Sequence, residues 1–373
     1  RSSLLEAKAI ALNFIKNKIQ TITFARSRLA VEVMLTYLRE EMKKISDGKS
    51  LVRGYRGGYL PKERRDIEKG LREGKILGVV STNALELGID IGNLDASVIT
   101  GYPGSIASTW QQMGRAGRRN SISASILVAS SSPLDQFIIN HPEYFFDASP
   151  EHGLINPDNL YILVSHIKCA AFELPFVDGE IFGNQDIGEI LSFLESERIL
   201  RHVGGRWHWM AESFPAEEVS LRSASTENFV IIDITEGAKV IGEVDRTSAP
   251  TMIHEEAIYI HAGQQFQVEK LDYEEKKAYV RKVNVDYYTD ANLAVEIKVL
   301  DVFKQKPTNE VENYVGEVMV TSLATMFKKI KFFTHENIGF GQIHLPPEEM
   351  HTTSYWLSVP ADTGNLSQEE MES

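Results

Sequence analysis

The spacing of apolar and polar positions changes period repeatedly over the first 140 residues of the chain. Apolar side chains recur every three or four positions over residues 5–15 and 29–44, a spacing that predicts amphipathic helices. Pro61 suits the first turn of a further, highly charged helix that ends near Gly74. Short apolar runs of the length of buried strands lie at residues 21–24, 76–80, 96–100 and 124–129. Helices that alternate with buried strands predict a parallel sheet with helices on both faces.

The pattern is different in the middle of the chain. Prolines divide residues 141–212 into short helices, of which residues 186–196 form the clearest. Two short strands then flank Gly204 and Gly205, and this arrangement predicts a hairpin. Helices followed by a small hairpin are typical of a winged-helix domain.

The last part of the chain is rich in strand patterns. We expect a small β-barrel over residues 213–305, because strand-like segments recur there at nearly regular spacing. Residues 306–373 are expected to begin a mainly helical unit with a frayed polar tail. The predicted fold class is therefore multidomain α/β, with domains at residues 1–140, 141–212, 213–305 and 306–373.

Composition narrows the class of protein. Of the 373 residues, 43% are hydrophobic and 24% are charged, as in an ordinary globular chain. No run of 18 apolar residues and no signal-peptide pattern occurs, so we expect no membrane partner. The single cysteine, Cys169, cannot form an internal disulfide or a cysteine-rich zinc site. The single cysteine favours a reducing, cytoplasmic setting. The ten histidines lack ligand spacing, so we predict no metal site.

Charge is distributed unevenly along the chain. The formal net charge is −13, yet residues 1–140 carry 21 basic and 13 acidic side chains, a balance of +8. A basic first domain on an acidic body is typical of a domain that meets polyanions. The alternative is that surface charge differs between the domains without any function.

The segment at residues 111–119, QQMGRAGRR, carries the strongest chemical signal. Its arginines Arg115 and Arg118 are three positions apart, so on a helix they would share one face. Two guanidinium groups placed in this way can converge on a triphosphate and stabilise the charge that develops during phosphoryl transfer. The alternative is the exposed basic end of a helix.

Three further segments follow predicted strands, where α/β sheets bind their ligands. Residues 81–92 include Thr82, which can donate to a phosphate, and Asp90, which can accept from a ribose hydroxyl. Residues 24–28 open a helix whose amides suit a phosphate backbone. Residues 55–59 combine glycines, which permit close contact, with the charge of Arg56.

In this order and spacing, the four segments resemble motifs IV, IVa, V and VI of superfamily 2 helicases. The resemblance covers residues 1–140 and implies the second of two RecA-like lobes. It implies that Arg115 and Arg118 are arginine fingers for ATP and that Gln111 is a nucleotide sensor. Gly88 and Asp90 would then lie on the ATP side. The nucleic-acid side would be formed by Ser27, Arg28, Arg56, Thr82 and Asn83.

The wording of the motifs, together with residues 339–348 and 350–356, most resembles the bacterial MrfA (YprA) helicases, a group similar to RecQ-related DNA-repair enzymes. The resemblance implies the C-terminal part of an ATP-dependent DNA helicase that moves 3′→5′ in DNA repair. Its partners would be single-stranded DNA, duplex junctions and the N-terminal RecA-like lobe of the same parent chain. ATP and Mg²⁺ would be held mainly by that lobe.

The sequence departs from the family because it has no Walker A string, no DExH string and no cysteine-rich module. We therefore expect no ATP hydrolysis by this chain alone. A non-motor module that binds nucleic acid and an RNA helicase of the same superfamily remain as alternative functions.

Two weaker features also bear on nucleic-acid binding. Trp207 and Trp209 could stack on bases, but we expect them to anchor the hairpin to its own domain, which leaves Arg206 as the candidate for gripping a duplex. The basic run at residues 328–331, followed by Phe332 and Phe333, could touch DNA, although a solvated helix face is the more common outcome.

Overall fold

The computed structural model describes residues 2–44, 51–89, 91–92, 94–117, 122–153, 158–219, 228–307 and 312–358. It divides into two compact units, which are described separately below. The first unit comprises Arg1–Tyr102, Gln111–Asp135 and Phe229–Ser373, and the second comprises Pro103–Trp110 and Gln136–Asn228.

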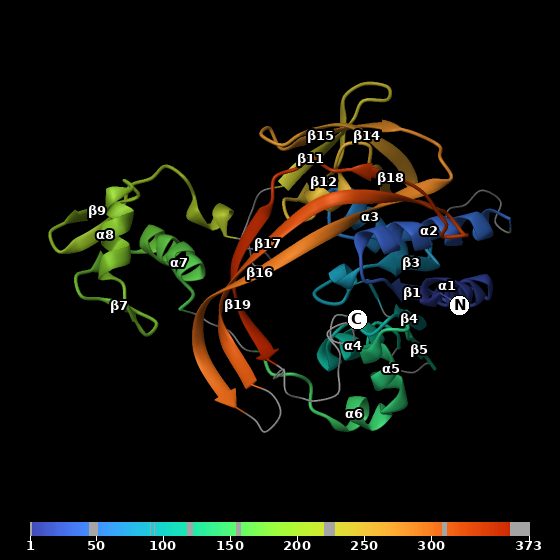
Figure 1. Cartoon of the computed structure of the whole chain (residues 1–373), viewed down its shortest axis with the longest axis horizontal. Coiled ribbons are helices and arrows are strands. Elements are labelled where there is room, and N and C mark those ends of the chain that lie inside the picture. Colours follow the sequence, from blue (N-terminus) through green and yellow to red (C-terminus); the bar gives the residue numbers. More distant parts are fainter. Residues whose placement is uncertain are drawn as a thin grey trace. The chain divides into compact units, whose positions relative to one another are not determined.

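The predicted parallel sheet is confirmed in the first unit (Figure 1). Its five strands lie in the order β2-β3-β1-β4-β5, and every neighbouring pair is parallel. Non-sequential neighbours of this kind require crossover connections, which the intervening helices supply. The strands are β1 (Thr21–Phe24), β2 (Val52–Tyr55), β3 (Gly78–Ser81), β4 (Ala96–Thr100) and β5 (Ala124–Val128).

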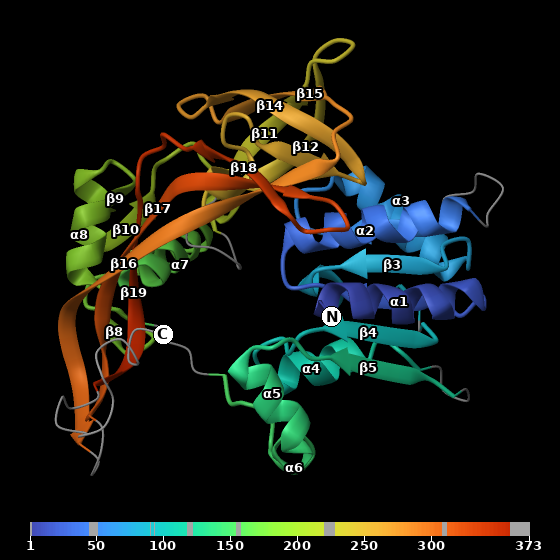
Figure 2. The same cartoon turned by 45° about the vertical axis from the view of Figure 1, so that its right-hand side comes forward.

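Apolar side chains cover both faces of this sheet, as the alternation of buried strand residues requires. Val80 and Val98 pack with the buried sides of α1 (Ser3–Lys16) and α2 (Arg28–Lys43). Val79 and Ile99, which point to the opposite face, pack with Ile67 and Leu71 of α3 (Pro61–Arg72). Helix α4 (Ile106–Met113) contributes Met113 to this second face. Figure 2 shows α1 and β4 side by side in this unit.

The strands predicted over residues 229–283 are all present, but they do not form the expected barrel. The described residues form an open five-stranded sheet in the order β12-β11-β15-β14-β13. Its core includes Phe229, Tyr259 and Val280, with the short helix α9 (Ala249–Met252) packed against it. The strands are β11 (Asn228–Asp233), β12 (Lys239–Asp245), β13 (Ile258–His261), β14 (Gln264–Asp272) and β15 (Lys277–Lys282).

The prediction of a helical unit over residues 306–373 is wrong. An antiparallel four-stranded sheet occupies the described part of this region, and the boundary expected at residue 305 falls inside its first strand. Alternating apolar positions such as Val295, Ile297 and Val299 give the two-residue period of a strand. The strands are β16 (Tyr287–Pro307), β17 (Glu312–Lys331), β18 (Asn337–Gln342) and β19 (Glu348–Ser358).

The second unit contains the predicted winged-helix pattern. Helices α7 (Leu160–Glu173) and α8 (Gly188–Ser196) share a core with Trp207 of the hairpin. The hairpin pairs β9 (Leu200–Val203) with β10 (Arg206–Trp209), as expected, and β6 extends it to three strands. The remaining elements of this region are α5 (Pro133–Asn140), α6 (Pro142–Asp147), β6 (Phe176–Val177), β7 (Ile181–Phe182), β8 (Gln185–Asp186) and the turn η2 (Pro215–Glu218). Within the described ranges, no helix is long and apolar enough to cross a membrane.

Candidate nucleotide and strand-binding site

Two predicted strand-binding hydroxyls lie at one edge of the parallel sheet. Ser27 follows β1 and caps α2, where its Oγ accepts a hydrogen bond from the Ala30 N–H at 3.1 Å. Thr82 follows the neighbouring strand β3 and caps the turn η1 (Asn83–Leu85), with a distance of 3.4 Å from Oγ1 to the Ala84 nitrogen. Both hydroxyls therefore cap the N-termini of helical turns, the kind of position at which backbone N–H groups can bind phosphate oxygens.

Of the neighbouring candidates, one is exposed and the other is held in an ion pair. Asn83 is exposed on η1. Arg28 instead forms an ion pair with Asp245 of β12, with 2.5 Å between its Nη2 and the carboxylate. Burial alone would raise the pKa of Asp245, but hydrogen bonds from Thr247 and Ser248 and the charge of Arg28 lower it to about 2. A strand that uses Arg28 must therefore compete with a carboxylate.

Arg56 does not fit its predicted role as a strand contact. Its side chain is 0% exposed, and its Nε donates to Glu32 Oε1 at 2.8 Å. Its Nη2 donates to the Tyr259 hydroxyl at 3.2 Å and to the Ile260 carbonyl at 2.9 Å. Burial by itself lowers the pKa of this guanidinium, but Tyr259 and Glu32 raise it overall, so Arg56 stays charged. Because every direction is blocked by protein, the prediction is wrong, and Arg56 instead ties the lobe to β13.

Glu32 is a residue that the sequence analysis missed. It is 1% exposed on α2, and its carboxylate accepts from Arg56, the Tyr59 hydroxyl and the backbone N–H groups of Ala262 and Gly263. The signal available in the sequence is a single acid within the otherwise apolar stretch VEVML of α2. A charge buried in this way is retained only when it is paired.

Among the described nucleotide-side candidates, Gln111 lies in α4 and Arg115 lies just beyond its end. The helix ends at Met113, so Arg115 lies in the turn that follows and not on the helix face that was expected. Its Nε donates to the Glu86 carbonyl at 2.9 Å and its Nη1 to the Ile89 carbonyl at 3.0 Å. Partial burial lowers its pKa. Arg115 therefore fixes the backbone of the loop that begins at Thr82.

Gln112 also joins the segment at residues 111–119 to the segment at residues 81–92. Gln112 donates to the Glu86 carboxylate at 2.9 Å, whereas Gln111 is exposed. Gly88 is exposed with a φ of 75°, a conformation that favours glycine. Asp90 and Arg118, the remaining two candidates, lie outside the described residues.

In the winged-helix hairpin, Arg206 is exposed, whereas Trp207 is not. Arg206 is exposed on β10. Trp207 is buried, and its indole N–H donates to Asp178 at 2.9 Å. The expectation that Trp207 anchors the hairpin to its own domain is confirmed.

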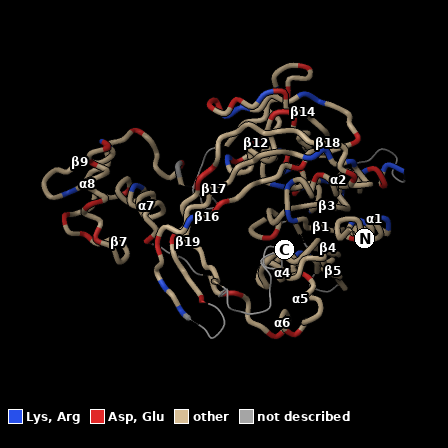
Figure 3. The backbone as a smooth tube through the Cα atoms, in the orientation of Figure 1, with Lys and Arg blue, Asp and Glu red and all other residues tan. Residues whose placement is uncertain are grey.

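Charges of both signs lie along the elements of the first unit (Figure 3). Among the described residues, no group of three or more His, Cys, Asp or Glu side chains could hold a metal ion. In the described residues, the site is built from helix N-termini capped by Ser27 and Thr82 and from the contacts of Arg115 with backbone carbonyls.

The chain matches two families of known domains. Residues 6–120 match the helicase conserved C-terminal domain, and residues 155–224 match the winged helix domain of the ATP-dependent helicase HRQ1. These matches confirm a RecA-like second lobe and a winged helix.

The chain is also similar to several helicases. It is 58% identical to the uncharacterized ATP-dependent helicase YprA of Bacillus subtilis (strain 168), covering 100% of this chain and 50% of the relative. Identity to the ATP-dependent helicase hrq1 of Schizosaccharomyces pombe is 31%, covering 96% of this chain and 34% of the relative. The chain thus spans half or less of the length of these relatives.

Solved structures give the same relationship. The DUF1998 helicase MrfA bound to DNA matches with a TM-score of 0.81 and 57% identity, covering 100% of this chain and 50% of that chain. MrfA bound to DNA and AMPPNP matches with a TM-score of 0.79 and 58% identity, covering 94% and 48%.

Proposed function

Since the chain resembles the MrfA and YprA family of superfamily 2 helicases along its whole length, we propose that it is the second-lobe and C-terminal part of an ATP-dependent DNA helicase. The observation that carries the proposal is the match of the entire chain to a helicase structure bound to DNA. Movement in the 3′→5′ direction, a role in DNA repair and a cytoplasmic location belong to the same proposal.

We infer that the chain completes an ATP site formed mainly by the first lobe of the parent protein. Arg118 would reach the phosphates, where it stabilises the negative charge of the transferring phosphoryl group. Gln111, Gly88 and Asp90 would line the same side. When bound there, Mg²⁺ would neutralise charge on the phosphates.

In this proposal, Arg115 is a positioning residue and not a second arginine finger. Its guanidinium bridges the Glu86 and Ile89 carbonyls, and the same loop carries Thr82 at its start. A displacement of the residues after α4 would therefore move the loop that contacts the strand. This connection would couple the ATP side to the nucleic-acid side.

We propose that Ser27, Thr82 and Asn83 contact the sugar–phosphate backbone of one strand, and that Arg206 contacts the duplex. Contacts with phosphates carry no sequence information, so binding would be largely independent of sequence. Single-stranded DNA and duplex junctions are the corresponding partners.

Strand binding tests this proposal directly. Thr82→Val removes the hydroxyl with little change of shape and should weaken binding of a labelled single-stranded DNA by a similar factor for every sequence. Thr251→Val is the matched control, because Thr251 bonds within α9. A loss restricted to one sequence, or an equal loss in the control, would contradict the assignment.

The same assay separates DNA from RNA as the preferred polymer. The proposal predicts tighter binding of a DNA strand than of an RNA strand with the same sequence. The reverse preference would favour the alternative of an RNA helicase.

A further inference from the structure

An open pocket of about 1950 Å³ lies within the first unit, beside the edge strand β2. One wall comes from α2, β2 and α3, and the other from the β13–β14 turn, the segment after β15 and the end of β17. It includes Leu51 and Lys75, which precede β2 and β3, whereas Ser27 and Thr82 follow the opposite ends of their strands. The pocket is therefore separate from the predicted strand contacts.

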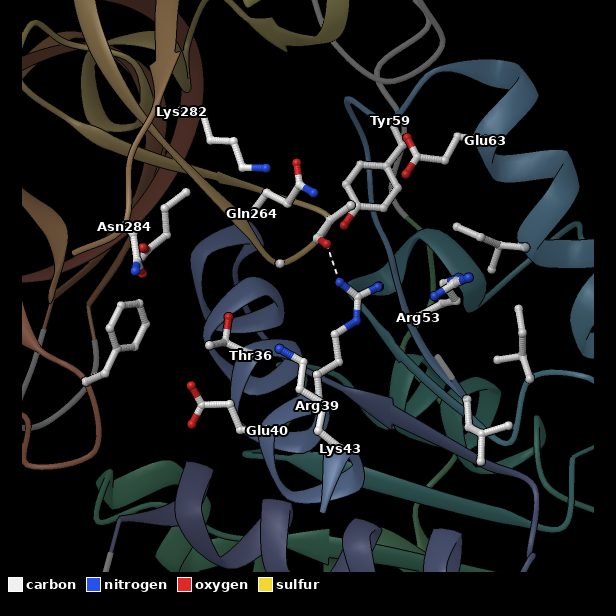
Figure 4. Close-up of a pocket in the computed structure, with 18 of the residues that line it drawn as sticks. Thr36, Arg39, Glu40, Lys43, Arg53, Tyr59, Glu63, Gln264, Lys282 and Asn284 are labelled. Carbon is white, nitrogen blue, oxygen red and sulfur yellow. Dashed lines mark hydrogen bonds between the residues drawn. The ribbon is translucent and has the colours of Figure 1, made fainter. Parts of the chain in front are cut away.

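Two arginines bring positive charge into this pocket (Figure 4). Arg39 donates to the carbonyls of Val52 and Ala262, and neither acceptor carries a charge. Burial lowers the pKa of Arg39, and the nearby charge of Arg53 lowers it further. Because like charges are held together here, an anion in the pocket would be stabilised.

Lysines from both walls and amides from the second wall line the same space. Lys43 of α2 and Lys282 at the end of β15 are exposed and line the pocket. Gln264 and Asn284 add amide groups (Figure 4). The lining carries six basic side chains and four acidic ones, Glu40, Glu63, Asp66 and Asp286, so its formal charge is +2.

An exposed aromatic ring completes the pocket. Phe333 is 47% exposed, and its φ of 66° is rare for a bulky side chain. The conformation is held because the Phe333 N–H donates to the Tyr37 hydroxyl at 2.9 Å, and the two rings pack against each other with centroids 4.6 Å apart and planes tilted by 31°. The strained turn therefore presents a rigid, partly exposed ring at the pocket wall.

We propose that this pocket is a second binding site for a single strand of nucleic acid, with phosphates on Arg39, Lys43 and Lys282 and a base on Phe333. Cations combined with an aromatic platform are the features that bind single strands without sequence preference. A small molecule would leave much of the volume empty, since ligand pockets usually hold about 300–1,000 Å³. The site deepens the proposed function and rests on it for the identity of the polymer.

Salt dependence of binding tests the lysine contacts. For the full chain and a labelled oligothymidylate, the double variant Lys43→Gln/Lys282→Gln should reduce the slope of log affinity against log salt by about 1.4, because each phosphate contact with a single strand contributes about 0.7. Lys239→Gln, which changes an exposed lysine outside the pocket, should leave the slope unchanged.

The ring of Phe333 is tested separately. Phe333→Ala should weaken oligothymidylate binding by roughly tenfold, in the range expected for loss of one stacked base. Phe333→Leu has the same backbone strain and similar bulk, so partial retention would locate the effect in packing of the base, and full loss in aromatic stacking. Either result supports the site, and equal binding by all three proteins overturns the stacking contact.

The outcomes distinguish this proposal from the proposed function. A normal affinity with an unchanged salt slope in the lysine variant would overturn the second site alone. A wild-type chain that binds no strand would overturn both. Displacement by tripolyphosphate as effective as by unlabelled strand, at equal phosphate concentration, would assign the pocket to free phosphate and overturn the strand proposal.

Discussion

Buried charge at single residues decides how the lobe is joined to the β-rich region. Arg56 and Glu32 are enclosed together, and they bond to Tyr259, Ile260, Ala262 and Gly263 beyond the lobe. A buried pair adds little net stability over apolar residues, but removing one partner is costly. These residues therefore hold two regions of the chain in one fixed arrangement.

Glu32→Gln should lower the free energy of unfolding by about 3–5 kcal/mol, because it leaves the charge of Arg56 buried without a counter-charge. Urea unfolding measures this loss, and Glu40→Gln, at an exposed position of α2, is the control. A loss below about 1 kcal/mol, as found for exposed pairs, would contradict the role of the pair.

Asp245 gives the first unit a pH dependence. Its pKa falls from 3.8 to about 2 on folding, so its stabilising effect is present above pH 4 and is lost as the pH falls toward 2. The effect is at most about 2 kcal/mol. Asp245→Asn should flatten the change of urea midpoint between these pH values, whereas Asp66→Asn should not. If Asp245→Asn and the wild type show the same change of urea midpoint between these pH values, the lowered pKa of Asp245 is refuted.

At the scale of elements, the sequence predicts the bounds of buried strands better than it predicts contacts between residues far apart in the chain. The buried runs gave β1 and β4 with their correct bounds, because an apolar run between helices has few other interpretations. Arg56 was assigned wrongly because its partner Tyr259 is 203 positions away, and no local pattern reports such a contact. Strands β17, β18 and β19 were not predicted, and only the part of β16 before residue 305 fell in the region expected to be rich in strands. Register shifts interrupt the two-residue alternation where β16 pairs with β17.

The contact between the turn after α4 and the loop after η1 has a measurable consequence. Arg115→Ala removes the donors to the Glu86 and Ile89 carbonyls, so hydrogen exchange over residues 86–89 should become faster and strand affinity should fall. Arg65→Ala, at an exposed position of α3, is the control. Unchanged exchange in this loop would show that Arg115 does not position it.

At the scale of the whole molecule, the charge balance agrees with the division of labour that we propose. Residues 1–140 are basic and contain the proposed ATP and strand contacts, whereas the rest of the chain is acidic. In our proposal the lobe does not hydrolyse ATP alone, because Arg118 completes a site formed mainly elsewhere in the parent protein. Activity is therefore a property of the intact parent.

The central claim is that this chain supplies an arginine that reaches the ATP held by the other lobe of a DNA-driven motor. The most direct measurement is ATP hydrolysis by the intact parent, with and without single-stranded DNA, for the wild type, Arg118→Ala and the neighbouring control Arg119→Ala. The account predicts strong stimulation by DNA that Arg118→Ala abolishes, with a loss of about 10³-fold or more in turnover, while strand binding persists. Near-normal turnover in Arg118→Ala, or no turnover by a wild-type parent that still binds DNA, would contradict it.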